Sequence, residues 1–203
     1  GAKQMILYNA LGKVVYAGQR FATLGVIIIN VSTLAKVAKF MDTGMPLVDR
    51  VVTVDGSAIK EPKNLLVPIG TPYRYLVEAA GGLKCEPGRV VNGGPMMGHA
   101  VPSLDYPVLK TTGSVLVFSE ADSVIHEPTP CIHCGRCVEG CPMHLMPPEI
   151  SRAVTTKDID QLQKLGVMTC MECGTCAYNC PAGRQIVQNI RLGKALVKNA
   201  GKR

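Results

Sequence analysis

The first part of the chain has a hydrophobic pattern that predicts a strand followed by a helix. Residues 25–30 (GVIIIN) form a short β-branched run of the kind found in buried strands. Apolar residues then recur at helical spacing over residues 34–41, and Ser32 or Thr33 can cap this helix. A strand followed by a helix indicates the end of an α/β unit.

From Pro46 onward the pattern changes to short strands separated by turns. Strands are predicted over residues 50–54, 64–69, 89–92 and 114–119. A single helix is predicted between the second and third of them, with Thr71 as its cap, Pro72 in its first turn and Gly81-Gly82 at its end. We therefore expect a small mixed sheet curled over one helix.

The last part of the chain predicts helices between cysteine-rich loops. Residues 148–154, 158–165 and 184–199 are the candidates, and the last has a basic face that is typical of solvent exposure. Gly193 lies inside this last helix, where it costs about 1 kcal/mol relative to alanine. Residues 127–130 hold two prolines and read as a linker. The fold class is α+β, in three domains over residues 1–45, 46–125 and 126–203.

Composition places the chain among globular proteins. Of its 203 residues, 47% are hydrophobic and 18% are charged, which excludes a disordered chain. The longest apolar run, residues 24–29, is too short to cross a bilayer, so no transmembrane segment is predicted.

The cysteines carry the chemistry. Eight of the nine lie in residues 131–180, and residues 131–142 and 170–181 both read C-x2-C-x2-C-x3-C-P. This is the bacterial ferredoxin spacing for 4Fe–4S clusters. Three thiolates two residues apart can surround one side of a cluster, and the loop amides can donate hydrogen bonds to its sulfurs. Gly135 and Gly174 occupy equivalent places, where we expect a side chain to crowd the iron core.

The fourth cysteine of each such run usually binds the other cluster. The first predicted cluster has the ligands Cys131, Cys134, Cys137 and Cys180. The second predicted cluster has the ligands Cys170, Cys173, Cys176 and Cys141. Crossed ligands join both motifs into one unit and bring the clusters close enough for rapid electron exchange.

Other interpretations of these residues are weaker. Structural zinc prefers two separated C-x2-C pairs, and disulfides need an oxidising compartment and are not arranged as close triplets. His133 and His144 lie beside the loops but are not needed as ligands. Cys85 has no partner in sequence and is expected to be a buried or half-buried thiol. No catalytic residue is predicted.

The charge is compatible with this interpretation. A formal charge of +7 suggests an acidic partner, but two oxidised clusters with their thiolates lower it to roughly +3. Tryptophan is absent and only nine residues are Phe or Tyr, so few side chains can stack on bases. We therefore predict no nucleic-acid partner, and the class of DNA-repair iron–sulfur proteins is disfavoured.

Several segments resemble one family, the C subunits of the Rnf ion-translocating ferredoxin:NAD+ oxidoreductases. Residues 46–82 are similar to its soluble-ligand-binding β-grasp (SLBB) domain, and residues 91–98 (VNGGPMMG) follow it as in the family. The doubled ferredoxin motif completes the match. Residues 1–45 resemble the end of the family's α/β domain that binds FMN and NADH, but the glycine-rich loops of that domain have no match here. We therefore expect a segment of a longer protein.

The resemblance implies electron transfer through two 4Fe–4S clusters. FMN and NADH are expected only in the intact family protein, so this chain alone should lack NADH activity. The implied partners are other subunits of the membrane complex, with ferredoxin or flavin as redox partner. The implied location is peripheral, on the cytoplasmic side of the plasma membrane. Soluble homologues that serve proline reductase or cobalamin reductase share the architecture and stay as alternatives, as does a binding module with structural clusters.

Overall fold

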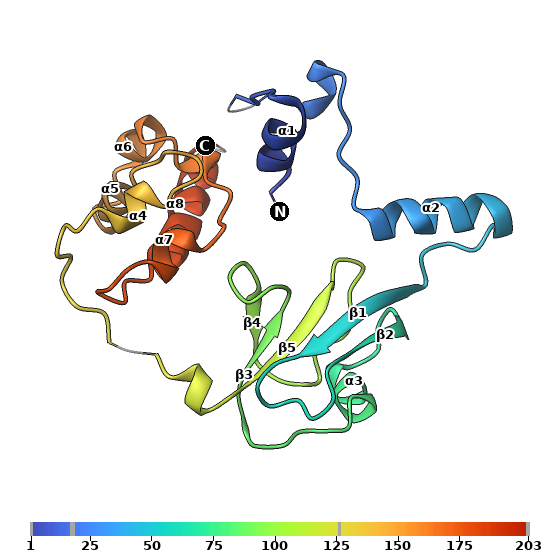
Figure 1. Cartoon of the computed structure of the whole chain (residues 1–203). Coiled ribbons are helices and arrows are strands. Elements are labelled where there is room, and N and C mark those ends of the chain that lie inside the picture. The colour runs from blue at the N-terminus through green and yellow to red at the C-terminus, as the bar shows by residue number, and fades with distance from the viewer. Residues whose placement is uncertain (1, 17–18, 126, 202–203) are drawn as a thin grey trace. The chain divides into compact units, whose positions relative to one another are not determined.

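The computed structural model describes residues 2–16, 19–125 and 127–201 (Figure 1). The chain forms two compact units, one made of Ile29–Ile125 and the other of Gly1–Ile28 together with His126–Arg203. Within the described ranges, every helix is too short or too polar to cross a membrane.

The first of these units, Ile29–Ile125, is built around a sheet and one crossing helix. Its elements are α2 (Val31–Thr43), β1 (Asp49–Asp55), β2 (Lys63–Pro68), α3 (Tyr73–Ala79), β3 (Pro87–Asn92), β4 (His99–Val101), β5 (Ser114–Ser119) and the short 3-10 helix η2 (Ala121–Ser123). The strands form a sheet of order β2-β1-β5-β3-β4 (Figure 1). β1 and β5 run parallel at its centre, and the remaining pairs are antiparallel. The predicted mixed sheet with one helix is therefore confirmed.

Buried and exposed residues alternate along the central strands, and the buried ones form the core of this unit. Val52 and Val54 are buried, whereas the residues between and beside them on β1 face outward. This is the period of two that a half-buried strand requires. Val115 and Val117 on β5 and Tyr73 on α3 pack into the same cluster. The strands and the helix thus bury one common hydrophobic face.

Two details of this unit differ from the prediction. Pro72 is the N-cap residue of α3 rather than its first helical residue, and the Thr71 hydroxyl donates to the Pro68 carbonyl at 2.9 Å instead of capping the helix. β4 was not predicted, because its three residues are too few to show an alternating pattern.

The strand predicted over residues 25–30 is wrong. A 3-10 helix, η1 (Phe21–Leu24), ends at Gly25, and the following residues are extended without strand pairing. Ile27 and Ile29 are 79% and 52% exposed. A β-branched run becomes a strand only where a neighbouring strand completes its hydrogen bonds, and the described sheet lies entirely within residues 49–119.

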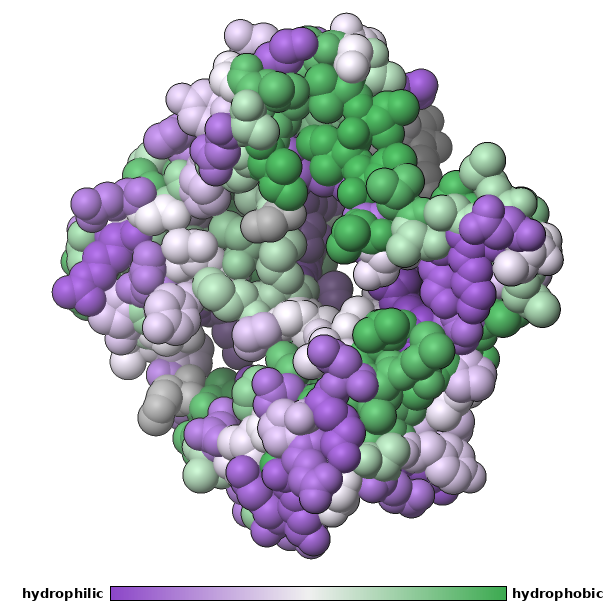
Figure 2. Space-filling view, turned by 45° about the vertical axis from the view of Figure 1, so that its right-hand side comes forward, coloured by the Kyte–Doolittle hydropathy of each residue, from purple (hydrophilic) through white to green (hydrophobic). Residues whose placement is uncertain are grey.

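The helix after this segment, α2 (Val31–Thr43), is confirmed, but its cap is not the predicted one. The Asn30 side chain accepts a 2.9 Å hydrogen bond from the Ser32 amide, so Asn30 is the N-cap. The helix buries none of its residues. Figure 2 shows hydrophobic side chains at the surface of the molecule, and those of Leu34, Phe40 and Met41 on α2 are more than half exposed.

The second unit contains α1 (Lys3–Leu11), which was not predicted, and the helical tail. The tail elements are α4 (Arg136–Glu139), α5 (Pro147–Thr155), α6 (Ile159–Lys164), η3 (Val167–Thr169), α7 (Thr175–Tyr178) and α8 (Ile186–Ala200). The three predicted helices, α5, α6 and α8, are each within two residues of their expected ends. Asp158 caps α6 by accepting from the Gln161 amide at 2.9 Å. Ile150, Leu162 and Ile190 form the centre of the tail's core.

Replacing Gly56 by alanine should destabilise the sheet unit. A Cβ at this position would lie 2.2 Å from the Val117 carbonyl oxygen, and the backbone has a φ of +121°. We expect a loss of about 2–4 kcal/mol in the free energy of unfolding. Gly94→Ala is the matched control, because a Cβ there meets no atom within 4 Å. Calorimetric unfolding of both variants measures the difference, and equal stability would contradict the steric explanation.

Candidate metal centre

The two cysteine loops are halves of an internal repeat. Cys131 and Cys170 begin the two motifs, at an interval of 39 residues. The same interval relates three pairs of positions at which the backbone of the tail has a positive φ: His133 and Glu172, Gly135 and Gly174, and His144 and Gly183. The N-caps of α5 and α8, Met146 and Gln185, are also equivalent. The chain therefore folds twice into the same loop followed by a helix.

The loop backbone brings amide groups to the cysteine sulfurs. The Leu145 amide donates to Cys141 Sγ at 3.4 Å, and the Glu172 amide donates to Cys170 Sγ at 3.3 Å. Alternation of left-handed and other conformations turns successive amides toward one side, an arrangement that suits anionic clusters. These amides can therefore stabilise thiolates that carry iron.

The glycines of the loops are explained by their backbone conformation. Gly135 and Gly174 have φ values of 77° and 87° and precede the short helices α4 and α7. L residues rarely adopt this region. A Cβ on Gly135 would meet no protein atom within 4 Å, so crowding by the chain itself does not exclude a side chain there. That a side chain would crowd the iron core stays a prediction.

Equivalent residues of the two halves contact one another. A Cβ on Gly140 would lie 2.6 Å from Asn179 Nδ2, and a Cβ on Gly193 would lie 2.7 Å from Val154 Cγ2. Each of these pairs is separated by the repeat interval. Contact between equivalent residues indicates an approximate two-fold relation, in which α4 packs beside α7 and α5 beside α8. The fold thereby brings the two motifs together.

In the first group of thiols, Cys137 is joined by a cysteine of the other motif. Burial raises the pKa of the Cys137 thiol, and the nearby thiols of Cys180 and Cys131 raise it further, against hydrogen bonds from the backbone. Cys180 belongs to the second motif but interacts with the first. Cys134 is exposed, and none of these thiol interactions includes it.

In the second group of thiols, Cys176 is the most deeply buried of the eight motif cysteines, at 8% exposure. Burial raises the pKa of the Cys176 thiol to about 12. The other thiols that raise it belong to Cys170, Cys173 and Cys141. Because iron binds the thiolate, loading this site must release protons. The first motif's Cys141 thus lies with the three leading cysteines of the second.

These donors suit a cluster better than a single ion. Among the residues that the structure describes, no three His, Cys, Asp or Glu side chains converge on a point that could hold one metal ion. In a cubane each thiolate binds a different iron atom, so four sulfurs surround the cluster rather than one point. An all-thiolate donor set is also the usual one for 4Fe–4S clusters.

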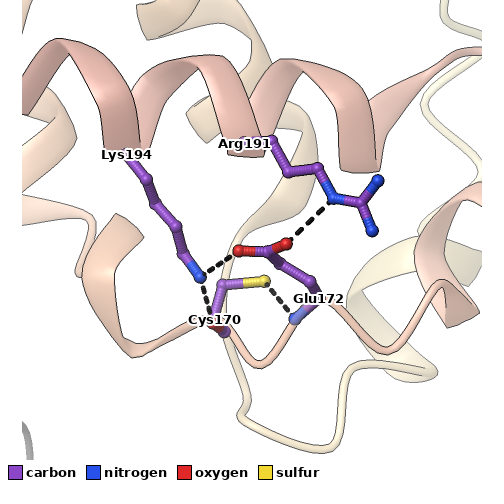
Figure 3. Close-up of polar contacts among 4 residues, drawn as sticks. All are labelled: Cys170, Glu172, Arg191 and Lys194. Carbon is purple, nitrogen blue, oxygen red and sulfur yellow. Dashed lines mark hydrogen bonds and ion pairs between the residues drawn. The ribbon is translucent and has the colours of Figure 1, made fainter. Parts of the chain in front are cut away.

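A charged network secures the second loop (Figure 3). Glu172 accepts from Arg191 Nε at 2.9 Å and from Lys194 Nζ at 2.6 Å, and Lys194 also donates to the Cys170 carbonyl at 2.6 Å. Burial alone would raise the pKa of Glu172, but the hydrogen bonds from Lys194 and Arg191 hold it below its ordinary value. The network joins α8 to the loop.

Two expectations about side-chain exposure are corrected here. The basic residues of the last helix were expected on a solvated face, but the side chain of Lys194 is only 14% exposed and turns inward to Glu172. The sequence holds no local signal for this contact, because the two residues lie 22 positions apart. Cys85, expected to be buried or half-buried, is exposed.

The fold and the cysteine loops define a class of protein: a sheet domain joined to a two-cluster iron–sulfur domain. The SLBB domain family matches residues 51–100, and the 4Fe-4S dicluster domain family matches residues 123–181. The chain therefore carries iron–sulfur clusters of the 4Fe–4S type.

Curated relatives identify the family more closely. The C subunit of the proton-translocating ferredoxin:NAD(+) oxidoreductase complex of Clostridium ljungdahlii is 41% identical over all of this chain and 45% of its own length. The C subunit of the Na(+)-translocating complex of Acetobacterium woodii is 40% identical over 96% of this chain and 44% of its own length. The C subunit of the ion-translocating oxidoreductase complex of Rhodobacter capsulatus is 37% identical, also over 96% of this chain, and over 37% of its own length.

Over nearly all of its length, the chain is homologous to part of the C subunits of Rnf-type ion-translocating oxidoreductases. This confirms the resemblance found in the sequence. The chain spans less than half the length of these curated relatives.

Replacing Gly193 by alanine tests whether helix propensity or helix packing dominates the stability of the protein at this position. Propensity alone predicts a gain of about 1 kcal/mol in stability. The contact of a new Cβ with Val154 at 2.7 Å predicts instead a loss of about 1–3 kcal/mol, because α5 and α8 must move apart. Thermal unfolding followed by helical circular dichroism measures the sign. Gly201→Ala, where the nearest atom to a Cβ lies at 3.7 Å, is the control. A net gain for Gly193→Ala would show that the halves tolerate separation.

Proposed function

We propose that this chain transfers electrons through two 4Fe–4S clusters as part of a membrane-associated ferredoxin:NAD+ oxidoreductase complex that is coupled to ion translocation. The observation that carries the proposal is the paired loop structure, in which one cysteine of each half lies near thiols of the other half. Such clusters accept and release one electron at a time. The chain contributes burial, amide hydrogen bonds to sulfur and a short separation between the two sites.

We propose crossed ligand sets. Cys131, Cys134, Cys137 and Cys180 bind one cluster, and Cys170, Cys173, Cys176 and Cys141 bind the other. The proximity of Cys180 to Cys137, and of Cys141 to Cys176, supports this assignment. The contacts between equivalent residues of the two halves support it independently.

The proposed domains, partners and location of the chain are based on its similarity to the relatives named above. Residues 46–125 would form the SLBB domain with a β-grasp arrangement, and residues 126–203 the two-cluster domain. Residues 1–45 would be the end of an α/β domain that binds FMN and NADH in the whole protein. The partners would be other subunits of the complex, with ferredoxin or flavin as electron donor or acceptor, at the cytoplasmic face of the membrane. The support is the similarity to subunits of such complexes.

Anaerobically prepared chain should contain about eight iron and eight sulfide and should be reduced reversibly by a low-potential donor. The measurements are iron and sulfide assays and low-temperature EPR through repeated cycles of reduction and reoxidation. Cys85→Ser is the control and should retain both clusters, because Cys85 lies outside the two motifs. Clusters that cannot be cycled without loss of iron would indicate a binding module with structural clusters instead.

Crossed ligation predicts that Cys180→Ala damages the cluster held by the first motif, not the one held by its own sequence neighbours. Cys141→Ala should do the reverse. Cys134→Ala and Cys173→Ala identify the two EPR signals, since each removes a ligand that stays with its own loop in either scheme. If Cys180→Ala instead removes the signal that depends on Cys173, the ligands are not crossed.

A further inference from the structure

The two halves of the tail share a backbone but differ in charge. At the repeat interval, Arg152 on α5 corresponds to Arg191 on α8, so one cation is common to both halves. The positions of two further charged residues, Glu172 and Lys194, correspond to His133 and Thr155 in the first half. The first loop also carries Arg136, where the second has Thr175, but Arg136 is exposed and its charge is screened by solvent.

In the second half, these side chains hold a cation against the loop. Lys194 Nζ lies 2.6 Å from the Cys170 carbonyl oxygen and 2.6 Å from Glu172 Oε1, and its side chain is 14% exposed. Arg191 Nε binds the other carboxylate oxygen at 2.9 Å (Figure 3). These three side chains together carry one net positive charge.

In the first half, the residues equivalent to Arg191 and Lys194 interact within their own helix. Arg152 is 75% exposed and pairs with Glu149 on its own helix. Thr155 is uncharged, and its hydroxyl donates to the Ser151 carbonyl of the same helix at 3.2 Å. His133 is exposed. The shared arginine is thus directed along α5 rather than toward its loop.

We propose that the Glu172–Arg191–Lys194 network gives the cluster on the second loop a higher reduction potential than the cluster on the first. This inference rests on the proposed electron-transfer function. An added electron increases the negative charge of a cluster, and a nearby cation lowers the free energy of that reduced state. A cation that is mostly shielded from solvent is less screened than an exposed one, so its effect persists in salt.

Glu172 acts as a positioning residue. Its carboxylate fixes Lys194 and Arg191 against the loop, and its own negative charge offsets part of theirs. An electron that enters the tail would therefore reside mainly on the second-loop cluster, while the first-loop cluster would exchange with the more reducing partner. The network would thereby give the two clusters different potentials, although the backbones of the two loops are equivalent.

The test is an EPR-monitored redox titration of both clusters in the anaerobic full chain. Lys194→Gln retains a hydrogen-bond donor but removes the charge, and should lower the potential of the second-loop cluster. We expect the reduced-to-oxidised ratio at a fixed potential to fall about tenfold, which is about 59 mV for one electron. Glu172→Gln keeps a side-chain oxygen that can accept from Lys194 but removes the negative charge, so it should shift the same cluster in the opposite direction. Lys194→Arg should preserve the original potential.

Lys198→Gln is the matched control, because Lys198 lies exposed one turn further along the same helix. It should change neither potential appreciably, and the first-loop cluster should shift little in any variant. Shifts of the same sign in Lys194→Gln and Glu172→Gln, or no shift in either, would overturn the proposal. If Lys194→Gln loses its cluster, the sign of the shift in Glu172→Gln decides. Clusters that fail to cycle in the unsubstituted chain would contradict the proposed function rather than the charge effect.

Discussion

The close crossing of α5 and α8 is the contact on which the cluster domain depends. At the crossing, a Cβ on Gly193 would lie only 2.7 Å from Val154 Cγ2, and Leu162 and Val167 pack around the same point. A short approach between helices requires a small residue, because side-chain volume sets the distance between their axes. The two loops precede these helices, so the approach of the helices determines how closely the loops face each other. Each motif can then present its fourth cysteine to the other half.

The loops themselves depend on backbone conformations that are unfavourable for isolated residues. His133 and Glu172 occupy the left-handed region without being glycine, which costs about 1–2 kcal/mol each. In the second loop, the ion pairs of Glu172 with Arg191 and Lys194 help to hold that conformation. Strain of this kind persists where the surroundings over-determine it, and it pre-organises the amides that point at the cysteine sulfurs. The left-handed backbone at Glu172 and the ion pairs of its side chain therefore both shape the second cysteine loop.

In the sheet unit, too, the hydrophobic pattern explains the strands, whereas a close backbone contact explains a glycine. Its strands alternate buried and exposed residues, and the parallel pair of β1 and β5 lies at the centre of the sheet. The chain leaves β1 through Gly56, directly beside the backbone of Val117 on β5. Hydrophobic alternation selects the strands, but a position without a side chain is what allows the turn to pack against the neighbouring strand.

The sequence by itself determined the chemistry and most of the local structure of this protein. Cysteine spacing specifies the cluster type because the metal requires thiolates at fixed intervals, and the short strands and α5, α6 and α8 follow from hydrophobic period and capping residues. Tertiary structure decided the rest. Residues 25–30 have strand composition but no pairing partner in the described sheet, so they are not a strand. The sequence indicates that Lys194 is a surface residue, but the fold places Glu172 beside it. Gly193 is explained by its close contact with Val154 on another helix. In each case the deciding interaction is non-local, and periodicity along the chain carries no information about it.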